Sequence, residues 1–285
     1  MKRLDFDTLG DTQKAFEAIE ATRTLMPGLP VLARLDGRAF HTFTKGLARP
    51  FDPRLAEAMQ ETTKELVRRF TPNLGYTQSD EITLVWLPAS DTHLLPIFSG
   101  RIAKLTSSLA AMASVVFNKE IAKTLSPSYL EQLPTFDARV WSVPNARLAA
   151  ENFLWREMDA TKNSVSALAS SKFSEKTLHG LSTSQRKGLL FEEGIVWDNL
   201  PNFAKRGIYY KRRTVSRDFT EEELTRLRQI PNWKPPEGPI LRTAVEEVNY
   251  PSLTTIANLA GVLFNDEPPV LEKELTDESN SEDHS

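Results

Sequence analysis

The chain has 285 residues, of which 40% are hydrophobic and 26% are charged, and its formal net charge is −3. These values are typical of an ordinary soluble globular protein, long enough for one large domain or two modest ones. The sequence contains no cysteine, which excludes disulfide bonds and thiolate zinc sites. No apolar run is as long as a membrane span and the first residues lack a signal-peptide core, so we expect a cytoplasmic protein without a membrane partner.

Charge is unevenly distributed along the chain. Residues 271–285 carry six acidic side chains and one lysine, which predicts a disordered acidic tail and leaves a charge of +2 on the first 270 residues. Residues 205–217, KRGIYYKRRTVSR, carry six basic side chains, no acidic one and two tyrosines. This segment could grip an RNA backbone, and a basic strand at a subunit interface is a second open interpretation.

The apolar pattern predicts a helix and then a strand at the start of the chain. We expect the helix over residues 12–25, with Asp11 as its N-cap and with Phe16 and Ile19 on its apolar side. Residues 30–36, PVLARLD, follow as a strand that ends on an aspartate.

The next elements complete a recognisable order. Asp52 and Pro53 predict the start of a helix that runs to residue 70. After it we expect a hairpin over 74–87 that turns at 78–80, a long helix over 99–125 and a strand over 134–144. The order strand, helix, two strands, helix, strand is the split βαββαβ arrangement of an α+β, ferredoxin-like core. We therefore expect a palm-like domain over residues 1–145.

A C-terminal extension follows over residues 146–270. Its pattern predicts a helix from Pro144 to about Phe173, a less regular region, and a further helix capped at Thr220. We expect this largely helical extension to pack on the palm-like core.

Three polar features converge in this arrangement. Asp36 precedes Gly37 at the end of the first strand, and Ser79, Asp80 and Glu81 occupy the hairpin turn, so the two aspartates could come close in the sheet. Arg101 and Lys104 lie on one face of the following helix. Two aspartates with a backbone carbonyl suit Mg²⁺, and cations nearby could hold a triphosphate. Such a set serves two-metal phosphoryl or nucleotidyl transfer.

Simpler interpretations remain open from these patterns alone. An Asp-Gly pair is common in turns, and charged residues at helical spacing usually form a solvated face.

Several motifs together resemble the signature of the tRNA-histidine guanylyltransferases and their bacterial and archaeal relatives. The motifs, in order between about residues 30 and 210, are RLDGRAFHTFTKG, ARPFD, YTQSDEITLVW, FSGRIAKLTSSLAAMASVVF, FDARVWSVPN, WREMDATKNS and KRG. The resemblance implies a polymerase-like palm, which agrees with the predicted element order.

The resemblance also implies roles for individual residues. Asp36, Asp80 and Glu81 would be catalytic, and Asp36, Gly37 and Asp80 would bind metal. The nucleotide and its phosphates would contact Asp36, Gly37, Arg38, Ala39, Phe40, His41, Arg49, Ser79, Asp80, Arg101 and Lys104. Arg49 stands where the family usually has a lysine. The tRNA or supporting positions would be Arg156, Asp159 and Asn163, to which the basic segment 205–217 adds Lys205, Arg206 and Arg212.

By this resemblance the protein would add nucleotides to tRNA 5′ ends, in the 3′–5′ direction. ATP or GTP would activate the tRNA 5′-monophosphate, GTP would be the preferred added nucleotide, two Mg²⁺ ions would assist, and the protein would be a homo-tetramer. The run ATKNSVSALASSKF at 160–173 replaces the sequence that eukaryotic members carry, which favours repair of truncated tRNA 5′ ends over strict tRNA-histidine specificity. The alternatives are a cyclase-like palm enzyme that does not act on tRNA and a non-catalytic tRNA-binding protein.

Overall fold

A four-stranded antiparallel sheet forms the centre of the computed structural model, which describes residues 6–88, 97–235 and 238–272. Its strands are β1 (Val31–Gly37), β2 (Leu74–Gln78), β3 (Glu81–Trp86) and β4 (Phe136–Ser142), in the order β4-β1-β3-β2. Helix α3 (Pro53–Phe70) connects β1 to β2, and α4 (Ile102–Ile121) connects β3 to β4. This is the expected ferredoxin-like βαββαβ core, so that prediction is confirmed.

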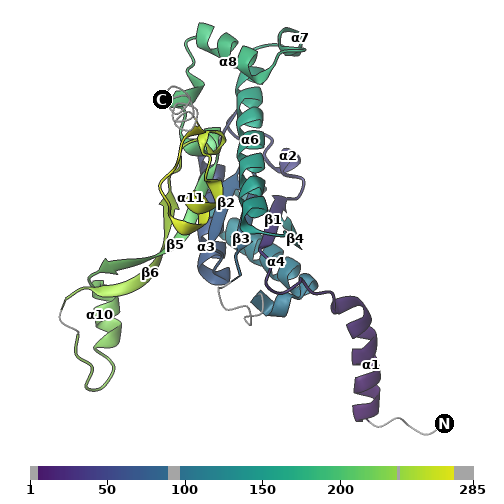
Figure 1. Ribbon diagram of the computed structural model, residues 1–285, viewed down its shortest axis with the longest axis vertical. Helices are drawn as coiled ribbons and strands as arrows, with labels where there is room; N and C mark the ends of the chain where they lie inside the picture. Colours follow the sequence, from purple (N-terminus) through teal and green to yellow (C-terminus); the bar gives the residue numbers. More distant parts are fainter. Residues whose placement is uncertain (1–5, 89–96, 236–237, 273–285) are drawn as a thin grey trace, which may run out of the picture.

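The C-terminal extension covers the sheet and also lengthens it. Helix α6 (Ala146–Ser170) lies on the face opposite α3 and α4. Strand β5 (Ile208–Arg217) pairs with β2, and β6 (Ile240–Val248) pairs with β5, which gives a six-stranded sheet. The distal part of the β5–β6 pair leaves the body as an arm that carries α10 (Glu221–Leu227) (Figure 1).

The N-terminal helix α1 (Phe6–Ala21) and several short elements complete the described chain. The short elements are α2 (Phe40–Phe43), α5 (Pro127–Leu130), α7 (Glu175–Leu178), α8 (Thr183–Glu192), α9 (Asn202–Lys205), α11 (Leu259–Asn265) and the 3₁₀ turns η1 (Ile97–Gly100), η2 (Trp197–Asn199) and η3 (Leu253–Thr255). None of the described helices combines the length and apolarity needed to cross a membrane.

Strand alternation divides the core into two layers. Leu35 and Leu84 face α3 and α4, where they join a buried cluster with residues such as Leu109. Leu32 and Val85 face the other way and pack with the α6 residues. Because successive strand residues point to opposite faces, the neighbour of each buried leucine must belong to the other layer. Asp36 therefore shares its face with Leu32, on the side that α6 covers.

The sequence predicted the start of α3 correctly. Asp52 is its N-cap, and the carboxylate accepts hydrogen bonds from the Arg54 backbone N–H at 3.0 Å and the Ala48 backbone N–H at 3.0 Å. Pro53 stands at the first helical position, where its missing N–H costs nothing.

Two local predictions need correction. The first helix spans Phe6–Ala21, so Asp11 lies inside it, and Phe16 and Ile19 are 62% and 70% exposed. Apolar spacing predicts a buried face, but no described part of this chain covers this one. The basic segment 205–217 falls in the region expected to be less regular, yet most of it is strand β5, which agrees with the basic-strand interpretation as far as secondary structure goes. The predicted disordered tail lies, from residue 273 onward, outside the described residues.

Candidate active site

Sheet pairing brings Asp36 and Asp80 to the same edge of the fold. The β1–β3 register places Asp36 opposite Glu81, the first residue of β3. The Gly37 backbone N–H donates a hydrogen bond to the Asp80 carbonyl at 3.0 Å, which fixes the β2–β3 turn against the end of β1. Ser79 occupies this turn with φ 49° and donates its hydroxyl to the Asp80 carboxylate at 3.0 Å.

The electrostatics of Asp80 reflect this crowding of carboxylates. Partial burial raises the pKa of Asp80 above its usual value, and the charges of Asp36 and Glu81 raise it further. The Ser79 hydroxyl and a backbone hydrogen bond act in the opposite direction. A cation between these carboxylates would relieve the repulsion.

Position 37 must be a glycine because the Phe40 ring lies where a side chain would begin. A Cβ atom at this position would lie 2.4 Å from the Phe40 ring, which is far inside van der Waals contact. Phe40 itself is 3% exposed and packs with Phe43, Phe117 and Phe136. Phe40 thus holds the segment after β1 in place, and its side chain does not face solvent. Any nucleotide contact there must come from the backbone or from the exposed neighbours.

The turn after β1 presents backbone donors. Ala39 adopts a left-handed conformation with φ 57° and caps the four-residue helix α2. Within the part of the chain that the structure describes, no acceptor takes a hydrogen bond from the N–H groups of Ala39, Phe40 and His41. Successive free N–H groups in such a turn form a concave donor array suited to phosphate oxygens. Arg38 and His41 are exposed on the same turn.

Glu81 is held by arginines rather than left free for a metal. Its carboxylate accepts hydrogen bonds from Arg34 and from Arg156 of α6. Arg34 also contacts Asp36 at 3.3 Å, and Arg156 contacts Asp159 at 3.1 Å. Only 4% of the Arg156 side chain is exposed. We interpret Glu81 as the residue that orients Arg34, and through it Asp36.

The network continues to a cavity that Ser79, the neighbour of Asp80, helps to line. Asn163 donates to Asp159 at 3.2 Å and lines a cavity of about 290 Å³. Arg49, Ser79 and Lys205 line the same cavity, between α6, α9 and the segment that precedes α3. Four predicted positions that are distant in sequence therefore meet at one opening.

Other predicted positions lie elsewhere. Arg101 and Lys104 are exposed near the start of α4, beside Phe98, which contacts Phe70 at the far end of the core. Phe70 lies against Trp86, and the β1–β3 register separates Trp86 from Asp36 by the length of β1, roughly 16 Å. The structure does not bring these two cations to the aspartates, because α4 runs with its C-terminal half toward Asp36.

Apart from Arg156, the cations predicted as tRNA or supporting positions are also separated by the structure. Lys205 and Arg206 line a second cavity. Arg212 lies farther along β5, in a surface depression that Glu61 and Arg68 also line.

Sequence reasoning did not single out Arg34 or Asp137. Arg34 lies two residues before Asp36, so strand periodicity puts both side chains on one face. Asp137 of β4 pairs directly with Asp36 and adds another carboxylate to that face. A strand-period search around Asp36 would have found Arg34, whereas Asp137 required the β1–β4 register.

The donor set fits magnesium with part of its coordination left open. Among the described residues, no group of three or more His, Asp or Glu side chains is arranged to hold a metal ion. Asp36, Asp80 and the Gly37 carbonyl offer a few oxygen ligands, and Mg²⁺ usually takes only one or two carboxylates with waters and substrate phosphates. Asp36, Gly37 and Asp80 are the residues that could hold such an ion.

Comparison with known sequences places this site in a family. The family model described as Thg1, tRNAHis guanylyltransferase, matches residues 11–144. An uncharacterised protein of Acanthamoeba polyphaga mimivirus is 30% identical over 233 residues, which is 74% of this chain and 80% of that protein. The tRNA(His) guanylyltransferase of Saccharomyces cerevisiae is 26% identical over 211 residues, 68% of this chain and 87% of the yeast protein.

Solved structures agree with the sequence comparison. A bacterial tRNA(His) guanylyltransferase (Thg1)-like protein in complex with ATP is 36% identical, with a TM-score of 0.65 over 71% of this chain and 88% of that one. A bacterial Thg1-like protein in complex with GTP is 29% identical, also with a TM-score of 0.65, over 87% of this chain and 94% of that one.

Proposed function

Because this chain belongs to the tRNA(His) guanylyltransferase family, we propose that it is a nucleotidyltransferase that adds nucleotides to the 5′ end of tRNA in the 3′–5′ direction. One observation carries the proposal. Asp36 and Asp80 meet at one edge of the sheet, and Ser79, the neighbour of Asp80, lines a cavity of about 290 Å³ together with Arg49. Carboxylates for metal and cations for phosphate are the parts that nucleotidyl transfer requires.

The side chains divide the work between binding and positioning. The free N–H groups of residues 39–41 would donate to phosphate oxygens of the triphosphate, and Arg49 and Lys205 would balance its charge. Arg34 and Glu81 would hold the Asp36 carboxylate in one orientation. Two Mg²⁺ ions at Asp36, Gly37 and Asp80, when bound, would neutralise charge at the transferring phosphorus and on the leaving pyrophosphate.

The proposed reaction has two transfers. An oxygen of the tRNA 5′-monophosphate attacks the α-phosphorus of ATP or GTP, and pyrophosphate leaves. The 3′-hydroxyl of GTP then attacks the tRNA 5′-phosphorus, and the nucleoside monophosphate leaves. Hydrolysis of the new terminal triphosphate can release pyrophosphate. Both transfers depend on alignment and charge, so no side chain needs to act as a nucleophile.

We further propose repair of truncated tRNA as the main role. Residues 160–173 lack the sequence that eukaryotic members carry there, and this part of α6 is a regular helix up to Ser170. Among the solved structures, two bacterial Thg1-like proteins are 36% and 29% identical to this chain, against 24% for the Saccharomyces cerevisiae enzyme.

The proposed assembly is a homo-tetramer in the cytoplasm. Helix α1 extends away from the body (Figure 1), and it exposes Leu9, Phe16 and Ile19. An apolar helix face of this kind needs a partner in solution, and another copy of the chain is the partner we propose.

One incorporation assay tests the function. The protein is mixed with Mg²⁺, ATP, labelled GTP and 5′-monophosphorylated tRNAs, some full-length and some lacking the first nucleotide. We expect label in the truncated tRNAs of several kinds. Label confined to full-length tRNA-histidine would replace repair with the guanylyltransferase role, and no label in any tRNA would reject the proposal.

A further inference from the structure

A second, larger cavity lies beside α6. Different residues of the same helix line the cavity of about 290 Å³ at which we place the nucleotide. The volume of the larger cavity is about 780 Å³, and α6, α8, η2, α9 and η3 contribute to its walls. This size is within the range of pockets that bind small organic ligands. Neither the metal residues nor the turn after β1 contributes to it, so the proposed chemistry leaves it unexplained.

Positive side chains dominate the accessible charge of this cavity. Lys162, Lys187, Lys205 and Arg206 line it together with three acidic residues. Two of the acids have partners outside the cavity, although Glu157 also pairs with the cavity's Arg206 at 3.7 Å. The Glu157 carboxylate accepts from the Tyr209 hydroxyl at 2.7 Å and the Leu253 N–H at 2.9 Å, and Asp159 pairs with Arg156.

Of the three lysines, Lys187 pairs with an acidic side chain, whereas Lys162 and Lys205 pair with no carboxylate of the described residues. The Lys187 ammonium lies 3.5 Å from the Trp197 ring centroid and 3.7 Å from the Asp198 carboxylate, while among the described residues Lys205 donates to the Asp198 carbonyl alone. Lys162 is exposed and forms no ion pair with any residue that the structure describes. Burial lowers the pKa of Lys205, and the neighbouring Arg206 charge lowers it further. A bound anion would relieve this repulsion.

An aromatic surface accompanies the cations. Trp155 lines the cavity and is 55% exposed, and the Arg156 guanidinium lies 4.6 Å from the centroid of its ring. An arginine on one face of the ring leaves the other face for stacking. Inorganic phosphate would use the lysines but not the ring, whereas a nucleotide would use both.

The two cavities are neighbours. Asp159 lines the larger cavity and Asn163 the smaller one, and a 3.2 Å hydrogen bond joins them across one helical turn. Lys205 lines both cavities. A ligand in the larger cavity therefore lies close to the nucleotide in the smaller one.

We propose that the larger cavity binds an unpaired nucleotide of the RNA substrate, with its base on Trp155 and its phosphates near Lys162 and Lys187. This assignment rests on the proposed function, because that function supplies the RNA. Because α6 and Lys205 border both cavities, an RNA strand bound in the larger cavity can place its 5′ end at the smaller one. The phosphates on both sides of that nucleotide would lie apart from one another, which fits cations that come from α6, α8 and α9 rather than from one loop.

Equilibrium binding of a dye-labelled, 5′-phosphorylated single-stranded RNA tetranucleotide to the full chain tests the assignment. Trp155→Ala should weaken binding about tenfold, whereas Trp155→Phe should stay within about threefold of wild type because it keeps an aromatic face. Lys162→Ala should lower the slope of log affinity against log salt by about 0.7. Lys119→Ala, an exposed lysine on α4 at the opposite face of the sheet, should match wild type.

Unchanged melting temperatures would show that the variants fold. Equal binding by wild type, Trp155→Ala and Lys162→Ala would overturn the assignment, and so would displacement of the tetranucleotide by ATP at equal concentration, which would indicate a site for free nucleotide. The proposed function fails separately: it fails if wild type extends no tRNA, whatever the tetranucleotide does.

Discussion

The contact between Gly37 and Phe40 decides the backbone geometry beside the metal residues. Gly37→Ala would place a methyl group 2.4 Å from the Phe40 ring, and that ring is enclosed by three other phenylalanines. We expect this substitution to destabilise the fold by about 1–3 kcal/mol, because the buried ring cannot move away freely. Urea unfolding would measure the change.

Gly188 of α8 is the matched control. A Cβ atom there meets nothing within 4 Å, so Gly188→Ala should stabilise the protein by about 0.5–1 kcal/mol through helix propensity. Equal effects of the two substitutions would contradict the close-approach explanation of Gly37.

At the residue scale the sequence predicted positions better than it predicted contacts. Asp36 and Asp80 could be placed together from the strand order alone. Phe40 could not be assigned to the core, because its neighbours Phe117 and Phe136 are distant in sequence. Glu81 was predicted to be catalytic, and only the three-dimensional structure shows that two arginines, one from β1 and one from α6, hold its carboxylate.

The cap of α3 links helix stability to pH. A hydrogen bond from the Arg54 side chain, the largest cause, lowers the pKa of Asp52 from 3.8 to about 2. A carboxylate with a lowered folded-state pKa stabilises the fold above its unfolded pKa, and this contribution is lost as pH falls through the folded pKa. Asp52→Ala should therefore cost about 1–2 kcal/mol at pH 7, and the difference from wild type should shrink between pH 4 and pH 2.

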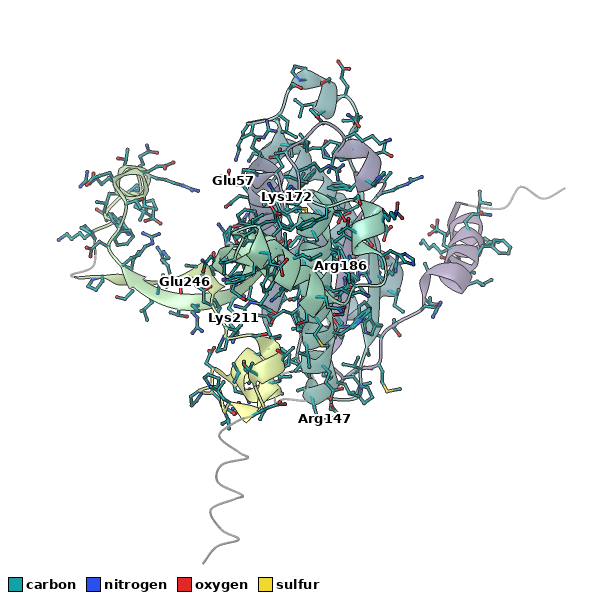
Figure 2. All side chains as sticks on the ribbon, turned by 90° about the horizontal axis from the view of Figure 1, so that it is seen from above. Glu57, Arg147, Lys172, Arg186, Lys211 and Glu246 are labelled. Carbon is teal, nitrogen blue, oxygen red and sulfur yellow. The ribbon has the colours of Figure 1, made fainter. Side chains whose placement is uncertain are left out.

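Glu57, exposed on the same helix (Figure 2), supplies the control. Glu57→Ala should change the free energy of unfolding by less than about 0.5 kcal/mol at pH 7. A constant difference between Asp52→Ala and wild type from pH 7 to pH 2 would contradict the role of the charged cap.

Helix α6 is tied to the sheet by a buried ion pair. Arg156→Ala would leave the Glu81 carboxylate, whose side chain is 13% exposed, without one of its two arginines. We expect a loss of about 3–5 kcal/mol in the free energy of unfolding. Adding Glu81→Gln to Arg156→Ala should recover part of this loss, and a double-mutant cycle would measure that coupling.

Arg147→Ala removes a comparable pair at the start of the same helix. The Arg147 guanidinium lies 2.6 Å from the Glu151 carboxylate, and the two side chains are 73% and 43% exposed. Loss of this pair should therefore lower the free energy of unfolding by less than about 0.5 kcal/mol. Strict additivity of Arg156→Ala and Glu81→Gln would show that the network does not act as a unit.

Element existence was largely predictable, and element partners less so. Capping residues and apolar stripes placed α3, α4, α6 and α10 within a few residues. The segment 205–217 could be a basic strand by its sequence, but its strand partners were not predictable, because Lys211, Arg212 and Arg213 follow one another without an apolar alternation and β6 starts 23 residues after β5 ends. The pairing with β2 covers the start of that strand, and the pairing with β6 covers the rest.

At the scale of the whole molecule, two projections leave the central body on opposite sides. Figure 2 shows α1 on one side and the arm with α10 on the other. The helical spacing of Phe16 and Ile19 predicted burial correctly only if a partner outside this chain covers them. A single sequence indicates that a face is apolar but does not say what covers it.

The proposed assembly makes a direct prediction. Phe16→Glu combined with Ile19→Glu should lower the mass measured by light scattering, because two charges would then lie in the contact. Lys14→Glu, on the same helix and 77% exposed at its side chain, should leave the mass unchanged. An identical mass for wild type and the double variant would place the subunit contacts elsewhere.

The central claim is nucleotidyl transfer at Asp36 and Asp80, and the fate of a labelled phosphate tests it most directly. Truncated tRNA with a radiolabelled 5′-monophosphate is incubated with Mg²⁺, ATP and GTP and then treated with phosphatase. Wild type should convert the label to a phosphatase-resistant form, and Asp36→Asn and Asp80→Asn should do so at least about a hundredfold more slowly with unchanged melting temperatures. The claim would be contradicted if phosphatase still released the label after incubation with wild type. It would also be contradicted if the two variants protected the label as fast as wild type.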